Sequence, residues 1–152
     1  MTIRMAQLDD IEHLIVLGWE MHQESRFQKM EFDVDKTANS LIQWLDADDC
    51  LLLVAEDKAG KIIGGFAGYA VAPWFSAEIQ AGDFGLFLTA KHRGGMTAFR
   101  LVRKYLEWAK SKKAVLIQLG ITTGFHVEQT GQLYERIGFK WMGSLFEYRE
   151  VA

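Results

Sequence analysis

One junction restricts the folds open to this chain more than any other feature: the segment LFLTAKHRGGMTAFRLV, residues 86–102. An apolar run typical of a buried strand ends in a basic turn with two adjacent glycines, and apolar residues then recur at helical spacing. A helix that begins in this way presents unpaired backbone N–H groups, which can bind an anion. The alternative is a tight strand-to-helix turn without a ligand, because short glycine motifs are common.

The size and composition of the chain predict a globular protein. Of its 152 residues, 49% are hydrophobic and 24% are charged, and we expect a single domain with one core over residues 1–152. The net charge of -3 argues against a dedicated nucleic-acid-binding protein. The N-terminal sequence has the pattern of neither a signal peptide nor a membrane span, so we predict a cytoplasmic protein with no nucleic-acid or membrane partner.

The cysteine and histidine content argues against several kinds of active site. The single cysteine, Cys50, excludes an internal disulfide framework and a cysteine-rich zinc site. The four histidines lack the spacing of metal ligands, and no serine or cysteine lies in the context of a nucleophile elbow. We therefore expect neither a bound metal nor a covalent enzyme intermediate.

The order of apolar periodicities predicts one mixed sheet with helices on its faces. Strand-like runs and helical spacings follow one another as β-α-α-β-β-β-α-β-α-β-β. Gly82 and Gly85 interrupt the strand expected over residues 77–89. Glycines inside a strand predict a bulge, or a place where something approaches the backbone closely.

The C-terminal part of the chain is expected to be a helix followed by two strands. Helical spacing over residues 127–137 ends at Gly138, a residue typical of a helix C-cap. Residues 139–151 then read as two strands, with Gly143 and Ser144 as a two-residue hairpin turn.

Two motifs resemble those of the GNAT N-acetyltransferase superfamily, which moves an acetyl group from acetyl-CoA to an amine. RGGMTA, residues 93–98, is similar to the pyrophosphate-binding pattern Gln/Arg-x-x-Gly-x-Gly/Ala, with Met96 where the family usually has glycine. LYERIGF, residues 133–139, is similar to the pattern Leu-Tyr-x-x-x-Gly-Phe. The resemblance covers essentially the whole chain, and it implies an α/β (α+β) fold with a mixed central sheet of about six to seven strands flanked by about four helices.

The resemblance also implies how acetyl-CoA binds as the cosubstrate. Its pyrophosphate is expected at the glycine turn and the start of the following helix, and its pantetheine arm along the backbone of the preceding strand. The expected pyrophosphate-binding residues are Arg93, Gly94, Gly95, Met96, Thr97 and Ala98, and the expected pantetheine-binding residues are Leu86, Phe87 and Leu88. Ordinary core packing of the strand side chains is compatible with this, since the ligand would use main-chain groups.

The second motif places the catalytic tyrosine of the family at Tyr134, and the resemblance implies that it protonates the departing CoA thiolate. A phenol with a pKa of about 10 stays neutral at physiological pH and can donate a proton. An amine with a pKa of about 10.4 must lose its proton before it attacks, and Asp83 and His126 are alternative bases. A loop histidine is more often structural. In this family, substrate-binding residues are also common near the position of Glu24.

Other functions stay open at this point. Met96, and Val127 where the family often has asparagine, favour a module that binds CoA, an acyl-CoA or a partner without transferring an acetyl group. A third function that the sequence leaves open is the binding of a small phosphate ligand unrelated to CoA. For an enzyme, the acceptor amine belongs to a small molecule or a protein, and the acidic net charge favours a cationic one. Trp19 and Trp74 are expected in the core or at a contact within a homodimer, and the alternative is a place beside a substrate pocket.

Overall fold

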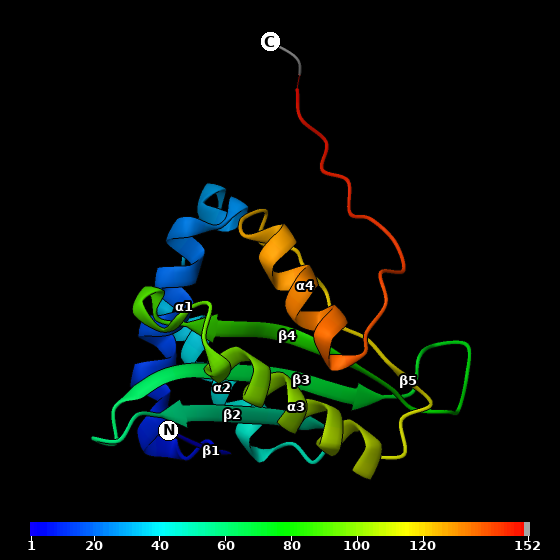
Figure 1. Ribbon diagram of the computed structural model, residues 1–152, viewed down its shortest axis with the longest axis horizontal. Helices are drawn as coiled ribbons and strands as arrows, with labels where there is room; N and C mark the ends of the chain where they lie inside the picture. Colours follow the sequence, from blue (N-terminus) through cyan, green and yellow to red (C-terminus); the bar gives the residue numbers. More distant parts are fainter. Residues whose placement is uncertain (151–152) are drawn as a thin grey trace.

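The structure of the chain is a computed structural model that describes residues 1–150. These residues form a five-stranded sheet with helices on both faces (Figure 1). Its strands are β1 (Thr2–Met5), β2 (Cys50–Glu56), β3 (Ile62–Val71), β4 (Gln80–Leu88) and β5 (Leu116–Ile117). Its helices are α1 (Ile11–Glu24), α2 (Val34–Asp46), α3 (Met96–Ser111) and α4 (Val127–Ile137), with short 3-10 helices η1 (Leu8–Asp10), η2 (Arg26–Lys29) and η3 (Ala90–His92). The strands lie in sequence order, and every neighbouring pair is antiparallel except β4 and β5.

The strand β2 is buried on both faces of the sheet. Leu51 and Leu53 point into a cluster under α3, whereas Leu52 and Val54 point into a cluster under α1 and α2. A strand covered by helices on both sides has no polar face, which explains why this segment reads as a continuous apolar run instead of an alternating one.

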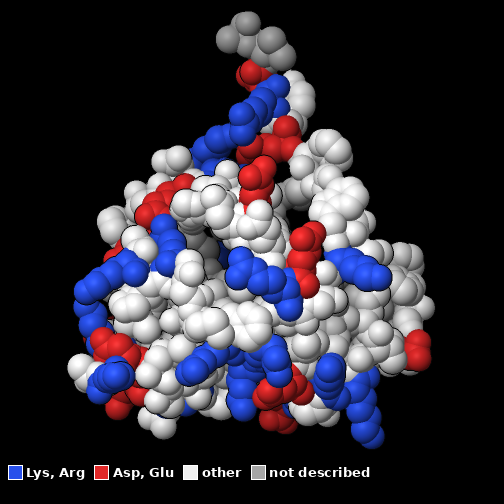
Figure 2. Space-filling model, in the orientation of Figure 1, with Lys and Arg blue, Asp and Glu red and all other residues white. Residues whose placement is uncertain are grey.

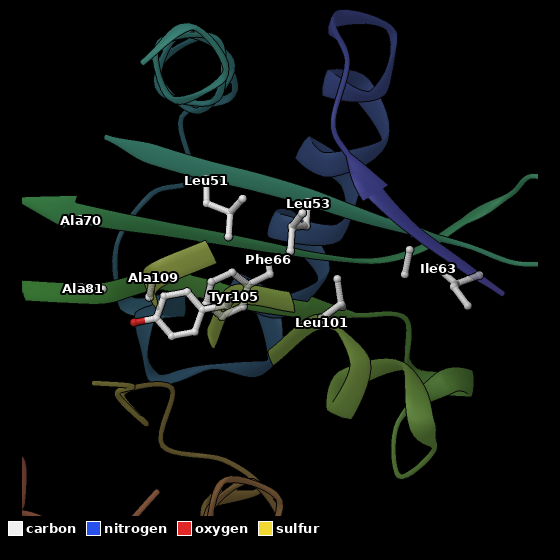
Figure 3. Close-up of a cluster of buried hydrophobic side chains, with 10 residues drawn as sticks. Leu51, Leu53, Ile63, Phe66, Ala70, Ala81, Leu101, Tyr105 and Ala109 are labelled. Carbon is white, nitrogen blue, oxygen red and sulfur yellow. The ribbon is translucent and has the colours of Figure 1, made fainter. Parts of the chain in front are cut away.

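The helix α3 is fixed on the sheet by side chains spaced one turn apart. Leu101, Tyr105 and Ala109 are fully buried, and the Tyr105 ring packs on Phe66 with ring centroids 4.7 Å apart (Figure 3). The Tyr105 hydroxyl donates a hydrogen bond of 2.8 Å to the carbonyl oxygen of Gln118. These contacts hold the N-terminus of α3 close to the end of β4, to which only η3 and a short turn connect it.

The predicted bulge in β4 is present. Ala67 of β3 pairs with Gly85, and the next residue, Gly68, pairs with Asp83, so Phe84 has no partner across the ladder. The bulge turns the Phe84 ring onto α2, where it stacks on Trp44 with a centroid distance of 4.2 Å and an interplanar angle of 2°.

Gly68 should tolerate no side chain, because β3 and β4 lie very close at the bulge. A Cβ atom at Gly68 would lie 2.9 Å from the backbone oxygen of Gly82 and 3.0 Å from the Phe66 ring. A backbone oxygen moves only if its strand shifts, so Gly68→Ala is expected to lower the free energy of unfolding by about 1–3 kcal/mol. Denaturation in urea measures this change.

The matched control is Gly18→Ala in the interior of α1. A Cβ atom there would make only an ordinary contact of 4.0 Å with Phe32, and replacing a helical glycine by alanine is expected to raise the free energy of unfolding by about 0.5–1 kcal/mol. Equal stability of the two variants would contradict the close approach of β3 and β4.

The predicted C-terminal strands are absent, which corrects the expected count of six to seven strands and the order β-α-α-β-β-β-α-β-α-β-β. Within residues 1–150 the order is β-α-α-β-β-β-α-β-α. Residues 139–150 belong to neither a helix nor a strand, and Val151, the last residue of the predicted segment, lies outside the described residues. The apolar run of residues 114–121 also forms a strand shorter than itself, since β5 is two residues long.

The predicted C-terminal strands do not form because they have no neighbouring strand to pair with. The chain leaves the sheet after Ile117, and no strand of the described residues flanks β5 on its outer side. A two-stranded hairpin alone is marginally stable in water at best, so turn residues at Gly143 and Ser144 do not suffice to form one. By contrast, the C-cap of α4 is confirmed: Gly138 has a left-handed φ of 113°, and its N–H donates to the carbonyl oxygen of Glu135 at 3.0 Å.

Candidate functional site

The parallel strands β4 and β5 diverge soon after they begin to pair. β5 pairs with β4 at only two residues, Gln80 and Ala81, while β4 continues to pair with β3 on its other side as far as Leu88. The β4 edge that faces β5 is therefore free of strand partners from Gly82 onward. Leu86, Phe87 and Leu88, the expected pantetheine-binding residues, lie on this free edge, where main-chain groups are open to a ligand.

Asp83 lies at the start of the divergence. Gln118 still donates its backbone N–H to the carbonyl oxygen of Ala81 at 3.0 Å, but the N–H of Gly120 donates to Oδ1 of Asp83 at 2.8 Å. A side-chain carboxylate thus takes the place of a backbone acceptor and holds the two chains apart. Burial raises the pKa of the Asp83 carboxyl above its ordinary value, and the hydrogen bond from Gly120 opposes this shift.

Tyr134 faces the same region from α4. Its side chain is 7% exposed, and the backbone N–H of Phe139 donates to its carbonyl oxygen, which fixes the last turn of the helix. Burial raises the pKa of the phenol, and the negative charge of Asp83 raises it further.

The Tyr134 hydroxyl is available as a hydrogen-bond donor. Among the described residues, the one buried side-chain nitrogen or oxygen without a partner is His22 Nε2. The Tyr134 oxygen is not among these atoms. A phenol of this kind stays protonated at neutral pH and can donate to a group that enters the divergence.

The start of α3 has the geometry of an anion site. Gly94 has a left-handed φ of 78°, a Cβ atom placed there would have no neighbour within 4 Å, and Gly95 is the N-cap without a side-chain capping bond. The first N–H groups of the 16-residue helix α3 are thus left for a ligand. Thr97 and Ala98 are buried and anchor the turn, while the Met96 side chain is exposed. These residues fit the pyrophosphate of CoA.

The Arg93 side chain, which is expected at the pyrophosphate, contacts three other parts of the chain. Its Nη2 lies 2.7 Å from Oε2 of Glu24 at the end of α1, and the guanidinium lies 5.6 Å from the centroid of the Phe125 ring. Nη2 also donates a long hydrogen bond of 3.4 Å to the carbonyl oxygen of Leu88. Arg93 therefore connects β4 to α1 and to the loop before α4, across the divergence of the strands.

His126 is not brought together with the other two catalytic candidates. It is the N-cap residue of α4 with a φ of 50°, and its ring lies edge-on against Phe125 with centroids 5.1 Å apart. Tyr134 follows eight residues later on the same helix, which at 1.5 Å per residue separates the two by about 12 Å along the axis. His126 thus lies at the N-terminal end of α4, whereas Tyr134 lies near the other end.

A basic surface covers α3 on the side of β1. Figure 2 shows lysine and arginine side chains over this helix, and a hollow of about 320 Å³ there is lined by Ile3, Phe99, Arg100, Arg103, Lys104 and Glu107. Because it includes Ile3 of β1, the hollow lies at the edge of the sheet farthest from β5. It is therefore separate from the β4–β5 divergence.

Residues 1–150 contain no group of three or more histidine, cysteine, aspartate or glutamate side chains placed to hold a metal ion. In the same part of the chain, the helices are all too short or too polar to span a bilayer.

Sequence reasoning missed two contributors to the site. Gly120 supplies the N–H that holds Asp83, although 37 residues separate the two, and Phe125 supplies the ring beneath Arg93. Gly82 and Gly85 are the sequence signal that strand pairing is irregular at this point. They do not identify the residues that contact Asp83 and Arg93.

The chain has the fold of many solved structures at low sequence identity. A transcriptional regulator from Bacillus halodurans C-125 is 20% identical, with a TM-score of 0.78 over 98% of this chain and 99% of that chain. AAC(6')-Iy in complex with the bisubstrate analogue CoA-S-monomethyl-acetylneamine is 16% identical, with a TM-score of 0.79 over 99% and 98% of the two chains. The aminoglycoside antibiotic 6'-N-acetyltransferase AAC(6')-IG from Acinetobacter haemolyticus is 14% identical, with a TM-score of 0.74 over 100% and 99%.

At these identities the structural likeness shows the fold alone, and no curated protein sequence matches the chain significantly. The sequence profile of the acetyltransferase (GNAT) family, however, matches residues 12–139. This range contains the free edge of β4, the turn before α3 and Tyr134. Because the match covers most of the chain, the protein belongs to the acetyltransferase (GNAT) family.

Proposed function

We propose that residues 1–152 form a single-domain N-acetyltransferase, which transfers the acetyl group of acetyl-CoA to a primary amine by direct attack in a ternary complex. The observation that carries this proposal is the buried carboxylate of Asp83 at the strand divergence, whose negative charge also raises the pKa of the Tyr134 phenol. From there, a free strand edge leads to the open N-terminus of α3. Membership of the acetyltransferase family supports the same reaction class.

Asp83 is proposed as the base. The structure gives its Oδ1 one hydrogen bond, from Gly120, which leaves Oδ2 to accept a proton from the attacking amine, directly or through one water. A base works best when its pKa lies near the operating pH, and burial shifts the pKa of Asp83 in that direction. His126 remains the alternative base, and its place at the other end of α4 makes it the weaker candidate.

Tyr134 is proposed as the acid. The hydroxyl donates its proton to the sulfur that leaves when the thioester bond breaks. Because burial and the charge of Asp83 both raise the pKa of the phenol, Tyr134 stays protonated throughout the neutral pH range until that step.

Acetyl-CoA, when bound, supplies the thioester carbonyl that the amine attacks. The chain would hold the pyrophosphate through N–H groups at Gly94, Gly95 and the first turn of α3. The main-chain groups of residues 86–88 would pair with the pantetheine arm. Both contacts would direct the thioester end of the cosubstrate toward Asp83 and Tyr134.

The acceptor is proposed to be a cationic amine of a small molecule or a protein. A hollow of about 450 Å³ between η2 and α2 is lined by Glu31, Phe32, Asp33, Val34 and Asp35, and its three carboxylates attract positive charge. Two of the similar structures are named for aminoglycosides or carry an acetylneamine analogue, which supports a polycationic acceptor.

A charge placed at the N-cap of α3 tests the proposed cosubstrate site. Gly95→Asp is expected to leave the apo protein at least as stable, because aspartate is a favoured N-cap residue and Gly95 has an extended backbone. Its carboxylate would compete with the pyrophosphate for the same N–H groups. A ligand at 100 times its Kd stabilises a protein by about 2.7 kcal/mol, and we expect Gly95→Asp to abolish this gain for acetyl-CoA in thermal denaturation.

Gly95→Asn is the matched control, because it has the same shape and capping ability without the charge. It should keep most of the stabilisation by acetyl-CoA. ATP should not stabilise the unchanged protein, and equal stabilisation by ATP would favour a general phosphate-binding protein instead. Tight binding of acetyl-CoA without transfer to any of a panel of amines would favour a CoA-binding module.

A further inference from the structure

The Arg93 guanidinium covers a main-chain group on the free edge of β4. The backbone N–H of Thr89 donates to the carbonyl oxygen of Ile63 at 3.1 Å, and thus points toward β3. In a trans peptide, the C=O of one residue points away from the N–H of the next, so the carbonyl oxygen of Leu88 points to the opposite, free edge. Nη2 of Arg93 donates to this oxygen at 3.4 Å. Arg93 therefore occupies the end of the edge that we propose for the pantetheine arm.

Two side chains from other elements hold the guanidinium in this place. Oε2 of Glu24, the last residue of α1, lies 2.7 Å from Nη2 of Arg93. The ring of Phe125, in the loop before α4, has its centroid 5.6 Å from the guanidinium carbon, and a cation is attracted to an aromatic face at this distance. The Arg93 side chain is 25% exposed. It is therefore a partly buried cation with an anion and a ring as its supports.

The two supports of Arg93 are tied to each other. The backbone N–H of Arg26 donates to the carbonyl oxygen of Thr123 at 2.8 Å, and its Nε donates to the carbonyl oxygen of Thr122. Figure 1 shows η2 beside the start of α4, as these bonds require. Because they lie close in sequence to both Glu24 and Phe125, they fix the ends of α1 and of the loop relative to each other. The guanidinium thus contacts a framework that stays in place when Arg93 moves.

This arrangement places Glu24 in competition with an anion at the start of α3. Arg93 directly precedes the turn whose N–H groups are proposed to bind the pyrophosphate, but its charge is paired with Glu24. A phosphate accepts strong, charge-assisted hydrogen bonds from a guanidinium, whereas a partly exposed ion pair contributes little free energy. A phosphate at this turn is therefore able to replace Glu24 as the partner of Arg93, and a neutral ligand is not.

We propose that Arg93 and Glu24 form a latch on the cosubstrate site, which a donor with phosphate groups opens and a donor without them does not. The inference rests on the proposed function. The phosphates of CoA would draw the guanidinium away from Glu24 and uncover the Leu88 oxygen for the pantetheine arm. A thioester with the same arm but no phosphate would have to break the ion pair without a replacement. The latch thus selects the donor by its charge, in addition to the affinity that the N–H groups of the turn provide.

A cycle of four full chains tests the latch: the unchanged chain, Glu24→Gln, Arg93→Gln and the chain with both changes. Calorimetry at low ionic strength gives the Kd for CoA of each. Glu24→Gln is expected to lower the Kd by on the order of 5-fold, because no carboxylate then competes for the guanidinium. In the Arg93→Gln background the same change should leave the Kd unchanged, since Glu24 acts through Arg93.

The matched control is Glu128→Gln, which removes the same charge from an exposed residue in the first turn of α4. Glu128 forms no ion pair with the described residues. Its substitution should change the Kd for CoA less than about 2-fold, because an exposed charge without a partner is largely screened. An equal gain in Glu24→Gln and Glu128→Gln, or an equal gain with and without Arg93, would overturn the latch in favour of general charge repulsion.

Pantetheine, which has the arm of CoA without its phosphates, gives the second test. Arg93→Gln should raise the Kd for CoA, because a phosphate contact is lost, and should lower the Kd for pantetheine, because the Leu88 oxygen is uncovered. We expect each change to be about 5-fold. Pantetheine that binds Arg93→Gln no more tightly than the unchanged chain would overturn the latch alone. Absence of CoA binding to all four chains would remove the proposed cosubstrate site, and the latch with it.

Discussion

Asp83→Asn is expected to lower kcat/KM for acetyl transfer by about 10²–10⁴-fold, the range that a positioned base contributes. Asparagine keeps an oxygen that can accept the N–H of Gly120, so the divergence of β4 and β5 is retained. It cannot take a proton from the amine. The pH–rate profile checks the assignment: the unchanged enzyme should lose activity as pH falls through the raised pKa of Asp83, and the variant should lack that acid limb.

The same substitution should stabilise the protein near neutral pH. Since the pKa of Asp83 is higher in the folded than in the unfolded chain, its contribution to stability is fully present below the unfolded value of about 3.9 and is lost as pH rises through the folded pKa. Asparagine does not titrate. We expect Asp83→Asn to be more stable by about 0.5–2 kcal/mol at pH 8, a gain typical of single stabilising substitutions, and to lose this advantage toward pH 4.

Urea denaturation at several pH values measures the stability difference, and steady-state kinetics of the same samples measures the rate. If Asp83 is a buried functional carboxylate, Asp83→Asn should have a lower kcat/KM and a higher free energy of unfolding than the unchanged protein. A variant that keeps kcat/KM within a few-fold would remove Asp83 as the base. His126→Gln would then be the next variant to examine, because His126 is the other titratable candidate.

Local sequence signals predicted the helices and the inner strands. The spacing of Leu101, Tyr105 and Ala109 predicts the buried face of α3, and Gly138 marks the end of α4 as the structure has it. These signals succeed because a helix face and its cap depend on residues within one or two turns. The bulge in β4 was predictable for the same reason, since glycines within a strand are a local feature.

Features that depend on a distant partner could not be predicted. Residues 139–150 include the apolar and aromatic residues typical of strands, but a strand requires a neighbour, and the sheet formed by the described residues ends at β5. In the site, the motifs predict roles for Gly94, Gly95 and Tyr134 from the sequence alone. They could not show that Glu24 pairs with Arg93, because that contact joins segments far apart in the sequence through the tertiary fold.

Tyr134→Phe is expected to lower kcat by about 10²–10⁴-fold while the folded state and the binding of acetyl-CoA stay intact. The substitution removes only the phenol hydroxyl, and the buried ring of α4 remains. If Tyr134 protonates the leaving sulfur, the loss lies in kcat and not in Kd for acetyl-CoA. Single-turnover kinetics with saturating acetyl-CoA measures this step directly.

Tyr105→Phe is the matched control, because burial and the charge of Asp83 raise the pKa of this phenol as well. Its hydroxyl, however, donates to Gln118, and its side chain is fully buried under α3. Losing that bond leaves a carbonyl oxygen without its partner and should cost about 1–3 kcal/mol of stability with a small effect on kcat. The two tyrosines thus make opposite predictions: one substitution affects the rate and the other the stability. Equal rate losses in both variants would mean that the effect of Tyr134→Phe comes from a change in packing around Asp83 and not from a lost proton donor.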